Sequence, residues 1–227
     1  MDIRLTAPST KFQAEFLAAV RRSRKLHRPW VTPPETSSEF RSYIRSKQSP
    51  TSIGYFVWSR DGALVGVINL SEIVRGQFQS AYLGYYAFAP HARKGYMRRA
   101  LCEVLHRAFF VYGLHRVEAN IQPRNRASRA LVESIGFRQE GFSPRYLKIL
   151  GSWRDHERWA ITREEWQMPA LDATTAVASP VRIAPSPKRR TASAARQART
   201  PKLPTPDSVA SPRRTGSGTS TGKSNRA

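Results

Sequence analysis

The sequence predicts an α+β fold in which a mixed, mostly antiparallel sheet carries helices on both faces. Strand-like and helix-like segments alternate through residues 1–167, and a hairpin pattern stands near each end of that region. Two amphipathic helices separate the strands between the hairpins. Hairpins make antiparallel pairs, and an amphipathic helix needs a sheet face on which to bury its apolar side. The patterns together therefore indicate a sheet packed on both faces.

The first third of the chain begins with a strand and two helices. Residues Ile3–Thr6 form the predicted strand, and Ser9 or Thr10 is placed to cap a helix that runs to about Arg24. Its apolar positions fall on one side: Phe12, Phe16, Ala19 and Val20. A proline-rich loop, HRPWVTPPET, leads to a short helix near Glu39–Ser46. The first hairpin then has two strands and a turn: Tyr55–Ser59, Leu64–Leu70 and Asp61-Gly62.

The next segment combines a strand, a turn and a helix. The strand is aromatic or apolar up to Tyr86, which suits a half-buried pleated surface, and Pro90 ends the strand pairing. The apolar residues of the helix recur at i, i+3, i+4, i+7, i+8 and i+11, as expected for one buried face: Leu101, Val104, Leu105, Ala108, Phe109 and Tyr112.

The turn before this helix is a candidate anion site. Arg93, Lys94 and Gly95 directly precede the helix. A helix N-terminus presents unpaired N–H groups and the positive end of the helix dipole. A glycine there lets a ligand approach the backbone, and the two cations add charge. Taken alone, the turn fits either a pyrophosphate site or an ordinary tight turn.

The last part of the predicted domain holds a strand, a helix and a second hairpin. The strand lies around Val117, and Asn125 opens the helix. Gly136 follows where a left-handed C-cap belongs, and Phe137 supplies the apolar contact that usually accompanies one. The closing hairpin has two strands and a turn: Leu147–Leu150, His156–Ile161 and Gly151-Ser152.

Composition restricts the partners and the compartment. The chain has 38 Lys and Arg against 16 Asp and Glu, a formal charge of +22, which favours nucleic acid, the ribosome or another anionic partner. Cys102 is the only cysteine, so we expect a buried structural thiol and no internal disulfide. No apolar run approaches the roughly 18 residues of a membrane span, and the N-terminus has no apolar signal segment. A cytoplasmic protein is expected.

Composition changes abruptly after Trp166. Residues 171–227 contain no Phe, Tyr or Trp, and they carry 11 Lys and Arg against two Asp, a net charge of +9. Such a segment has too few apolar side chains to offset the entropy of ordering. The sequence therefore predicts a domain over 1–170 and a basic, disordered tail over 171–227 that is rich in Pro, Ser, Thr and Ala. The tail is interpreted either as solubilising or as a contact to ribosome or nucleic acid.

Four segments carry a family pattern in their order and spacing: INLSEIVRGQFQSAYLGYY (Ile68–Tyr86), GLHRVEANIQPRN (Gly113–Asn125), SRALVESIGFRQEG (Ser128–Gly141) and YLKILGSWRDHERWAIT (Tyr146–Thr162). With the Gly95 turn they resemble the GCN5-related N-acetyltransferase (GNAT) superfamily, and within it the ribosomal-protein alanine N-acetyltransferases of the RimJ/RimL type. The resemblance covers about residues 1–167. It implies the GNAT fold, a mixed sheet splayed between its fourth and fifth strands. It also implies an enzyme that moves acetyl from acetyl-CoA to an amine by direct attack, with no metal.

The resemblance implies where acetyl-CoA would bind. The pyrophosphate would lie on backbone N–H groups of the turn, with ionic support from the first two of its residues: Arg93, Lys94, Gly95, Tyr96 and Met97. The pantetheine arm would run beside the backbone of Tyr86, Ala87 and Phe88, where an N–H group could also hold the oxyanion. Against the superfamily pattern Q/R-x-x-G-x-G/A, Gly95 matches, whereas Ala92 and Met97 depart. Main-chain donors do not depend on those side chains.

Two residues match the superfamily's Asn and Ser in the helix that follows. The resemblance implies that Asn125 contacts the pantetheine arm and that the Ser128 hydroxyl protonates the leaving thiolate. The alternative is that both residues only cap the helix. Some relatives use a tyrosine in this helix as the acid. Val132 stands at the corresponding place, which excludes that version of the mechanism.

The general base has two carboxylate candidates. Glu118 lies on a strand that borders the predicted splay, and its alternative role is an ion pair with an arginine. Glu72 is the next candidate. His156 follows Asp155, but adjacent strand residues face opposite ways, so we expect no catalytic dyad there. Deprotonation through water is also open, since an N-terminal amine has a pKa of roughly 8 and is partly neutral already.

The acceptor implied by the resemblance is the N-terminal α-amine of a ribosomal protein. Trp30 and Trp153 are interpreted either as walls of an acceptor groove or as core residues. Two other functions stay open. The same fold could acetylate a small amine, or the chain could be a non-catalytic ribosome- or RNA-binding factor. No membrane partner is expected.

Overall fold

A single mixed sheet organises the protein. The computed structural model describes residues 2–168, so the predicted tail, 171–227, lies outside the described residues. The sheet has seven strands in the order β1-β2-β3-β4-β5-β7-β6. Their bounds are β1 Ile3–Thr6, β2 Ile53–Ser59, β3 Leu64–Val74, β4 Ser80–Ala87, β5 Arg116–Ile121, β6 Arg138–Ile149 and β7 Ser152–Thr162. All neighbours are antiparallel except β4 and β5, which are parallel. The predicted class is confirmed.

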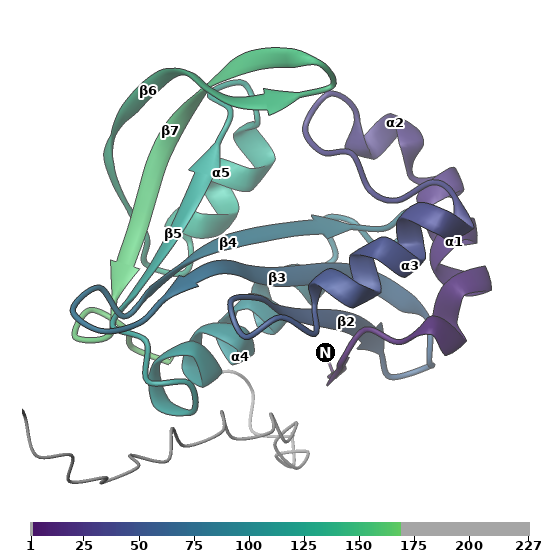
Figure 1. Ribbon diagram of the computed structural model, residues 1–227, viewed down its shortest axis with the longest axis horizontal. Helices are drawn as coiled ribbons and strands as arrows, with labels where there is room; N and C mark the ends of the chain where they lie inside the picture. The colour runs from purple at the N-terminus through teal and green to yellow at the C-terminus, as the bar shows by residue number, and fades with distance from the viewer. Residues whose placement is uncertain (1, 169–227) are drawn as a thin grey trace, which may run out of the picture. The chain divides into compact units, whose positions relative to one another are not determined.

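Helices cover both faces of this sheet (Figure 1). Their bounds are α1 Gln13–Arg22, α2 Arg24–His27, α3 Ser37–Ser46, α4 Tyr96–Phe110 and α5 Arg126–Glu133, with a 3-10 turn at Thr10–Phe12 before α1. One apolar cluster joins α1 and α3 to β2 and β3, and a larger one joins α4 to the other face. Among the described residues, no helix is long and apolar enough to cross a membrane.

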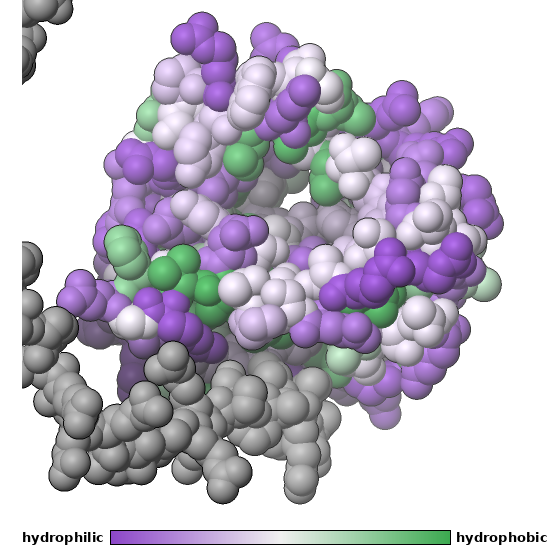
Figure 2. Space-filling view, viewed as in Figure 1, coloured by the Kyte–Doolittle hydropathy of each residue, from purple (hydrophilic) through white to green (hydrophobic). Residues whose placement is uncertain are grey.

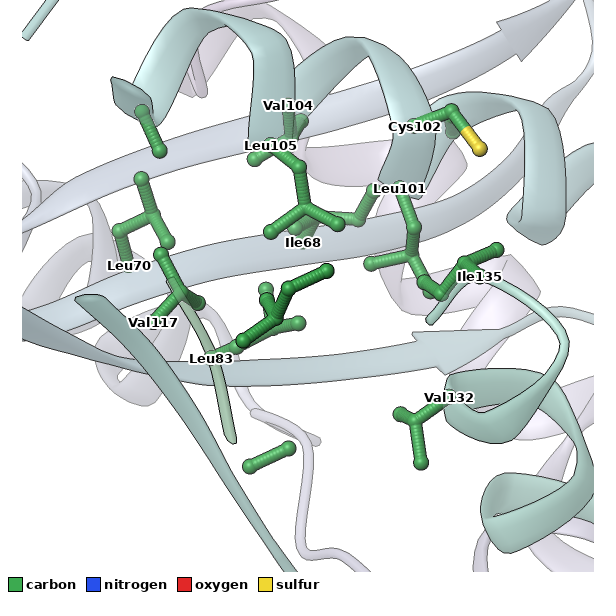
Figure 3. Packing of buried hydrophobic residues seen from close by; sticks show 14 of the residues in the cluster. Ile68, Leu70, Leu83, Leu101, Cys102, Val104, Leu105, Val117, Val132 and Ile135 are labelled. Atoms are coloured by element: carbon green, nitrogen blue, oxygen red, sulfur yellow. The ribbon is translucent and has the colours of Figure 1, made fainter. Parts of the chain in front are cut away.

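The larger apolar cluster fixes α4 and α5 against the sheet. Leu101 and Leu105 of α4 point at Ile68 of β3 and at neighbouring strand residues, and Val132 adds the contribution of α5 (Figure 3). All four side chains are buried. Cys102 is buried in the same cluster, as predicted for a structural thiol, and burial raises the pKa of its thiol. Because both ends of α4 depend on this packing, its N-terminus is held at a fixed place relative to β4.

The sheet opens between its two parallel strands. β4 pairs with β5 through only three residues, of which Tyr82, opposite Glu118, is the last. From Leu83 to Ala87, β4 keeps its pairing with β3 on one side but has no paired strand on the other. The predicted splay between the fourth and fifth strands is therefore confirmed. It leaves one edge of β4 with backbone groups that a ligand can pair with.

Two local predictions need correction, the end of the first helix and the closing hairpin. The first helix ends at Arg22 and not at Arg24, because the Ser23 hydroxyl donates to the Ala19 carbonyl, and Ser23 marks a break before α2. The last strand pair is longer than predicted and turns at Leu150-Gly151, where both residues have positive φ. In that hairpin Asp155 is exposed, whereas His156 is buried and its ring contacts the Arg154 carbonyl. The two do not form a dyad, which agrees with the prediction from the sequence.

Candidate active site

The N-terminus of α4 lies in a basic, uncapped turn. Gly95 is the N-cap at φ 79°, and Arg93 is also in the left-handed region at φ 63°. Arg93 and Lys94 are exposed, and no side chain of the described residues caps the helix. Burial lowers the pKa of His91, and the nearby charge of Lys94 lowers it further. Free N–H groups, left-handed residues and positive charge together suit a bound anion.

The departure at Met97 from the family pattern has a packing explanation. Met97 is buried in the first turn of α4. A Cβ built on Gly66 of β3 would clash with the Met97 sulfur. Gly66 therefore provides the space that the larger side chain fills, and α4 can begin close to the sheet in spite of the substitution. Tyr96, beside it, is half-buried, and its ring packs on His91.

At the open edge of β4, only some backbone N–H groups are free to donate a hydrogen bond to a ligand. The Phe88 N–H donates to the Val65 carbonyl at 2.8 Å, so it is already used, and the Phe88 side chain is fully buried. In an antiparallel ladder successive N–H groups point to opposite edges. The Tyr86 N–H therefore faces β3, and the Ala87 N–H faces the opening. Of the three predicted residues, Ala87 is the one whose N–H can meet a ligand.

A pair of hydroxyl groups joins β4 to α5 beside the opening. The Tyr85 hydroxyl lies 2.6 Å from the Ser128 Oγ and also donates to the Ser128 carbonyl at 3.2 Å. Burial raises the pKa of Tyr85 to about 12, so the phenol keeps its proton at neutral pH. Asn125 is the N-cap of α5, and its Oδ1 accepts the Ser128 N–H at 3.1 Å. Asn125 thus does cap the helix, while the Ser128 hydroxyl is directed to Tyr85.

Glu118 is engaged in an ion pair. Its carboxylate accepts from the Arg116 Nε at 2.8 Å, and Arg116 also pairs with Glu140, which holds the pKa of that second carboxyl below its usual range. Glu118 faces the side of the sheet that carries α3, because Tyr82, its register partner, lies on the same face as Tyr86. The arrangement fits the alternative role of Glu118, a strand carboxylate paired with arginine.

Glu72 lies apart from the other candidates. It is exposed, with φ 50°, at an irregularity of β3 between Ser71 and Val74. Its charge acts on Lys47, at the end of α3. The opening begins only beyond Tyr82, so the structure does not bring Glu72 together with Ser128 and Ala87.

Two residues at the opening were not found from the sequence. Tyr85 contacts Ser128 across 43 residues, and His27 contacts the Ala87 carbonyl across 60 residues, with Nε2 at 2.9 Å. Burial lowers the pKa of His27. Neither residue stands in a motif that indicates such a partner. The sequence placed Tyr85 only in an aromatic strand and His27 only at the start of the loop that contains Trp30.

A mixed sheet splayed beside an uncapped basic helix N-terminus is the arrangement of an acyl-CoA-binding acetyltransferase. The chain belongs to the acetyltransferase (GNAT) domain family, whose model matches residues 3–138. Members of this family use acetyl-CoA as the co-substrate for transfer to an amine. The predicted superfamily is thus confirmed.

Similarity to particular proteins points to one branch. The chain is 39% identical to the probable N-acetyltransferase YjcK of Bacillus subtilis over 115 aligned residues. These residues make up 51% of this chain and 63% of that protein. It is 39% identical over 103 residues to the ribosomal protein uS5-alanine N-acetyltransferase of Escherichia coli, 45% of this chain and 53% of that protein. The alignments therefore span little more than half of each relative. The resemblance to the RimJ/RimL type is confirmed.

A solved structure agrees with this placement. Mycobacterium smegmatis RimJ in complex with CoA-disulfide superposes with a TM-score of 0.67 at 28% identity, over 72% of this chain and 83% of that one. That neighbour is a complex with a CoA derivative.

Proposed function

We propose that this protein is an acetyl-CoA-dependent N-acetyltransferase whose acceptor is the N-terminal α-amine of a ribosomal protein. One observation carries the proposal. The unpaired edge of β4, the uncapped N-terminus of α4 and the Ser128 hydroxyl meet at the opening of the sheet. These are the parts that a thioester donor requires: a strand edge, an anion site and a proton donor.

The donor would be held mainly by main-chain groups. The N–H groups of Gly95, Tyr96 and Met97 would receive the pyrophosphate, with Arg93 and Lys94 as ionic support. The N–H of Ala87 would pair with the pantetheine arm or with the thioester oxygen. The side-chain Oδ1 of Asn125 accepts the hydrogen bond that caps the helix, so the side-chain NH₂ group is the part open to a pantetheine contact.

Transfer would proceed by direct attack. The neutral amine forms a C–N bond with the thioester carbonyl carbon, and negative charge develops on the carbonyl oxygen, where an N–H donor stabilises it. The C–S bond then breaks, and the thiolate takes a proton from the Ser128 hydroxyl. Tyr85 can replace that proton, because its phenol stays protonated and lies within hydrogen-bond distance.

The acceptor is inferred from chemistry and from the relatives. A 39%-identical relative carries the name of a uS5-alanine N-acetyltransferase. The formal charge of +22 favours a partner with an anionic surface, such as a ribosome. An N-terminal amine is partly neutral at pH 7, with a pKa of roughly 8, so it needs less help from a base than a lysine does. Glu118 and water are the remaining candidates for the base among those named from the sequence, since Glu72 lies outside the opening.

A substrate panel tests the proposal. The full chain is assayed for release of free CoA from acetyl-CoA with peptides that differ only in their first residue, beside a set of small amines such as polyamines. We expect turnover with the peptides and a preference among first residues. Turnover with the small amines alone would identify a small-amine acetyltransferase. No turnover with any amine, together with salt-sensitive RNA or ribosome binding, would identify a non-catalytic binding factor.

A further inference from the structure

His27 is a buried imidazole at the open edge of β4. It is the last residue of α2, only 3% exposed, and its Nε2 lies 2.9 Å from the Ala87 carbonyl oxygen. Because the Phe88 N–H is paired with β3, the carbonyl and the N–H of Ala87 both point to the other edge, which is the opening. The ring of His27 therefore lies where β4 has no partner strand.

This contact fixes the tautomer. A carbonyl oxygen can only accept, so the Nε2 of His27 must carry the hydrogen. The imidazole is held neutral, because burial lowers the pKa of His27. In a neutral imidazole with its hydrogen on Nε2, Nδ1 is a bare lone pair. Among the described residues that Nδ1 has no hydrogen-bond partner, although it is buried.

A second unpartnered group lies next to it. The Tyr86 hydroxyl is buried and has no partner within residues 2–168, and the rings of His27 and Tyr86 pack edge to face at 5.2 Å between centroids. Burying a polar group without a partner is costly. Two such groups on side chains whose rings pack together mark a place where a polar ligand would supply the missing hydrogen bonds.

A third unpartnered group lies on the same side of the sheet, on β5. Glu118 pairs in register with Tyr82, and their side chains face the α3 side of the sheet. Side chains alternate along a strand, so Asn120, two residues after Glu118, and Tyr86, four residues after Tyr82, face the same side. The buried Asn120 Oδ1 also has no partner in the described part of the chain. Seen from that side, the surface is hollowed between the β6–β7 hairpin and α2 (Figure 2).

We propose that His27, Tyr86 and Asn120 form the acceptor-amine site and that Nδ1 of His27 is the general base of acetyl transfer. Two of the three atoms can only accept a hydrogen bond, and the third can accept one. A primary amine donates hydrogen bonds, so the set selects an amine over an anion or a carbonyl. The proposal rests on the proposed function and names the residues that would serve it.

The proton transfers balance without any further reactant. The neutral amine donates an N–H to His27 Nδ1 and attacks the thioester carbon. As the C–N bond forms, the nitrogen becomes acidic and gives one proton to Nδ1, which makes an imidazolium. The C–S bond breaks, and the thiolate takes the proton of Ser128. The imidazolium then releases its proton to solvent, and Ser128 regains a proton from solvent through the Tyr85 hydroxyl. The products are the acetamide and CoA thiol.

His27 has an advantage over the carboxylates. Glu118 is occupied by Arg116, and Glu72 lies outside the opening. Nδ1 of His27 has no competing partner among the described residues. The charged and titratable groups that act on it are Glu35, which is paired with Arg24 at 2.9 Å, and the Tyr86 phenol.

The test uses the full chain with His27→Gln. The glutamine amide can still donate to the Ala87 carbonyl and offers an oxygen in place of Nδ1, but it is not basic. We expect kcat to fall by about 100-fold or more while the affinity for CoA, measured by calorimetry, stays unchanged. The acidic limb of the kcat/KM pH profile should disappear. His106→Gln, an exposed histidine on α4, is the matched control and should behave as wild type.

Further results separate this inference from the proposed function. If His27→Gln keeps the kcat and the pH profile of the wild type, His27 is not the base, but the proposed acetyltransferase activity stands. Tyr86→Phe should raise KM for the peptide more than it lowers kcat, and an unchanged KM counts against the site. If His27→Gln does not fold, nitrogen-15 NMR of the wild-type imidazole decides: a hydrogen on Nδ1 in the neutral state overturns the proposal.

Discussion

The Tyr85 phenol and the Ser128 hydroxyl lie 2.6 Å apart, and this hydrogen bond connects β4 to α5 across the open side of the sheet. Ser128 was predicted from the sequence as the acid, but its partner was not. Because the Ser128 N–H is also held by Asn125, both ends of this residue are fixed. The serine hydroxyl is therefore oriented before any substrate arrives.

Ser128→Ala should lower kcat by about 100-fold with little change in the affinity for CoA, since it removes the proposed proton donor. Tyr85→Phe should have a smaller effect in the same direction. Ser134→Ala is the control, because that hydroxyl only donates to the Leu131 carbonyl at the end of the same helix. Steady-state kinetics with a peptide acceptor measure the three variants. Unchanged kcat in Ser128→Ala would remove Ser128 from the mechanism.

Gly95→Glu should weaken CoA binding by at least about tenfold. The residue has φ 79°, where a side chain costs roughly 1–2 kcal/mol, and the new carboxylate would repel the pyrophosphate. Gly113→Glu is the matched control: φ is 64° and nothing lies within 4 Å of its Cβ position, at the other end of α4. Calorimetric titration with CoA measures both. Equal losses in the two variants would attribute the effect to strain alone.

Glu118→Gln should change kcat by less than about tenfold, which is below the usual contribution of a general base. It should also cost less than about 1 kcal/mol of stability, because the Glu118–Arg116 pair is partly exposed. Kinetics and urea unfolding measure the two quantities. If kcat instead fell by about 100-fold or more, Glu118 would be the base and His27 would be displaced from that role.

Stability should decline on mild acidification. Burial lowers the pKa of His27 and of His156 below the ordinary value of 6.5, so the unfolded chain binds more protons than the folded one. Their contribution is complete above pH 6.5 and is lost as the pH falls through the folded-state values. Urea unfolding at pH 7.5 and at pH 5 measures the difference. His27→Gln should reduce this loss of stability between pH 7.5 and pH 5, and His106→Gln should not. An equal loss in the wild type and both variants would contradict the role of His27 in the pH dependence.

Removal of residues 171–227 should leave peptide turnover intact and weaken ribosome binding. The truncation removes a net charge of +9, because residues 171–227 carry 11 Lys and Arg against only two Asp. The salt dependence of binding should become shallower, as fewer counterions are released. Sedimentation with ribosomes at several salt concentrations measures it. Loss of peptide turnover in a folded truncation would show that the segment takes part in catalysis.

The sequence predicted local elements well where the pattern was strong. The first strand has the predicted bounds, Ile3–Thr6, and Gly136 has the expected positive φ after α5. β6 was found only in part, because most of its side chains are exposed and show no apolar alternation. The break at Ser23 was missed because its hydroxyl makes two contacts, one of them to the Ala89 N–H, 66 residues away.

The site was predictable to the extent that its chemistry is local. The Gly95 turn is a property of consecutive residues, so it could be recognised from the sequence. The roles of Tyr85 and His27 depend on partners 43 and 60 residues away, and no periodicity indicates such a pair. Glu118 was a reasonable candidate from its strand, but the pairing with Arg116 is a matter of rotamers that a sequence does not specify.

Because β4 pairs with β5 through only three residues, the proposed donor would stabilise the fold as well as react. A thioester arm along Leu83–Ala87 would complete the sheet in the way that a missing strand would, and it would hold the two halves at one angle. Saturating acetyl-CoA should then raise the free energy of unfolding, by about 2.7 kcal/mol at 100 times Kd. The enzyme would be most rigid at the moment when it has a group to transfer.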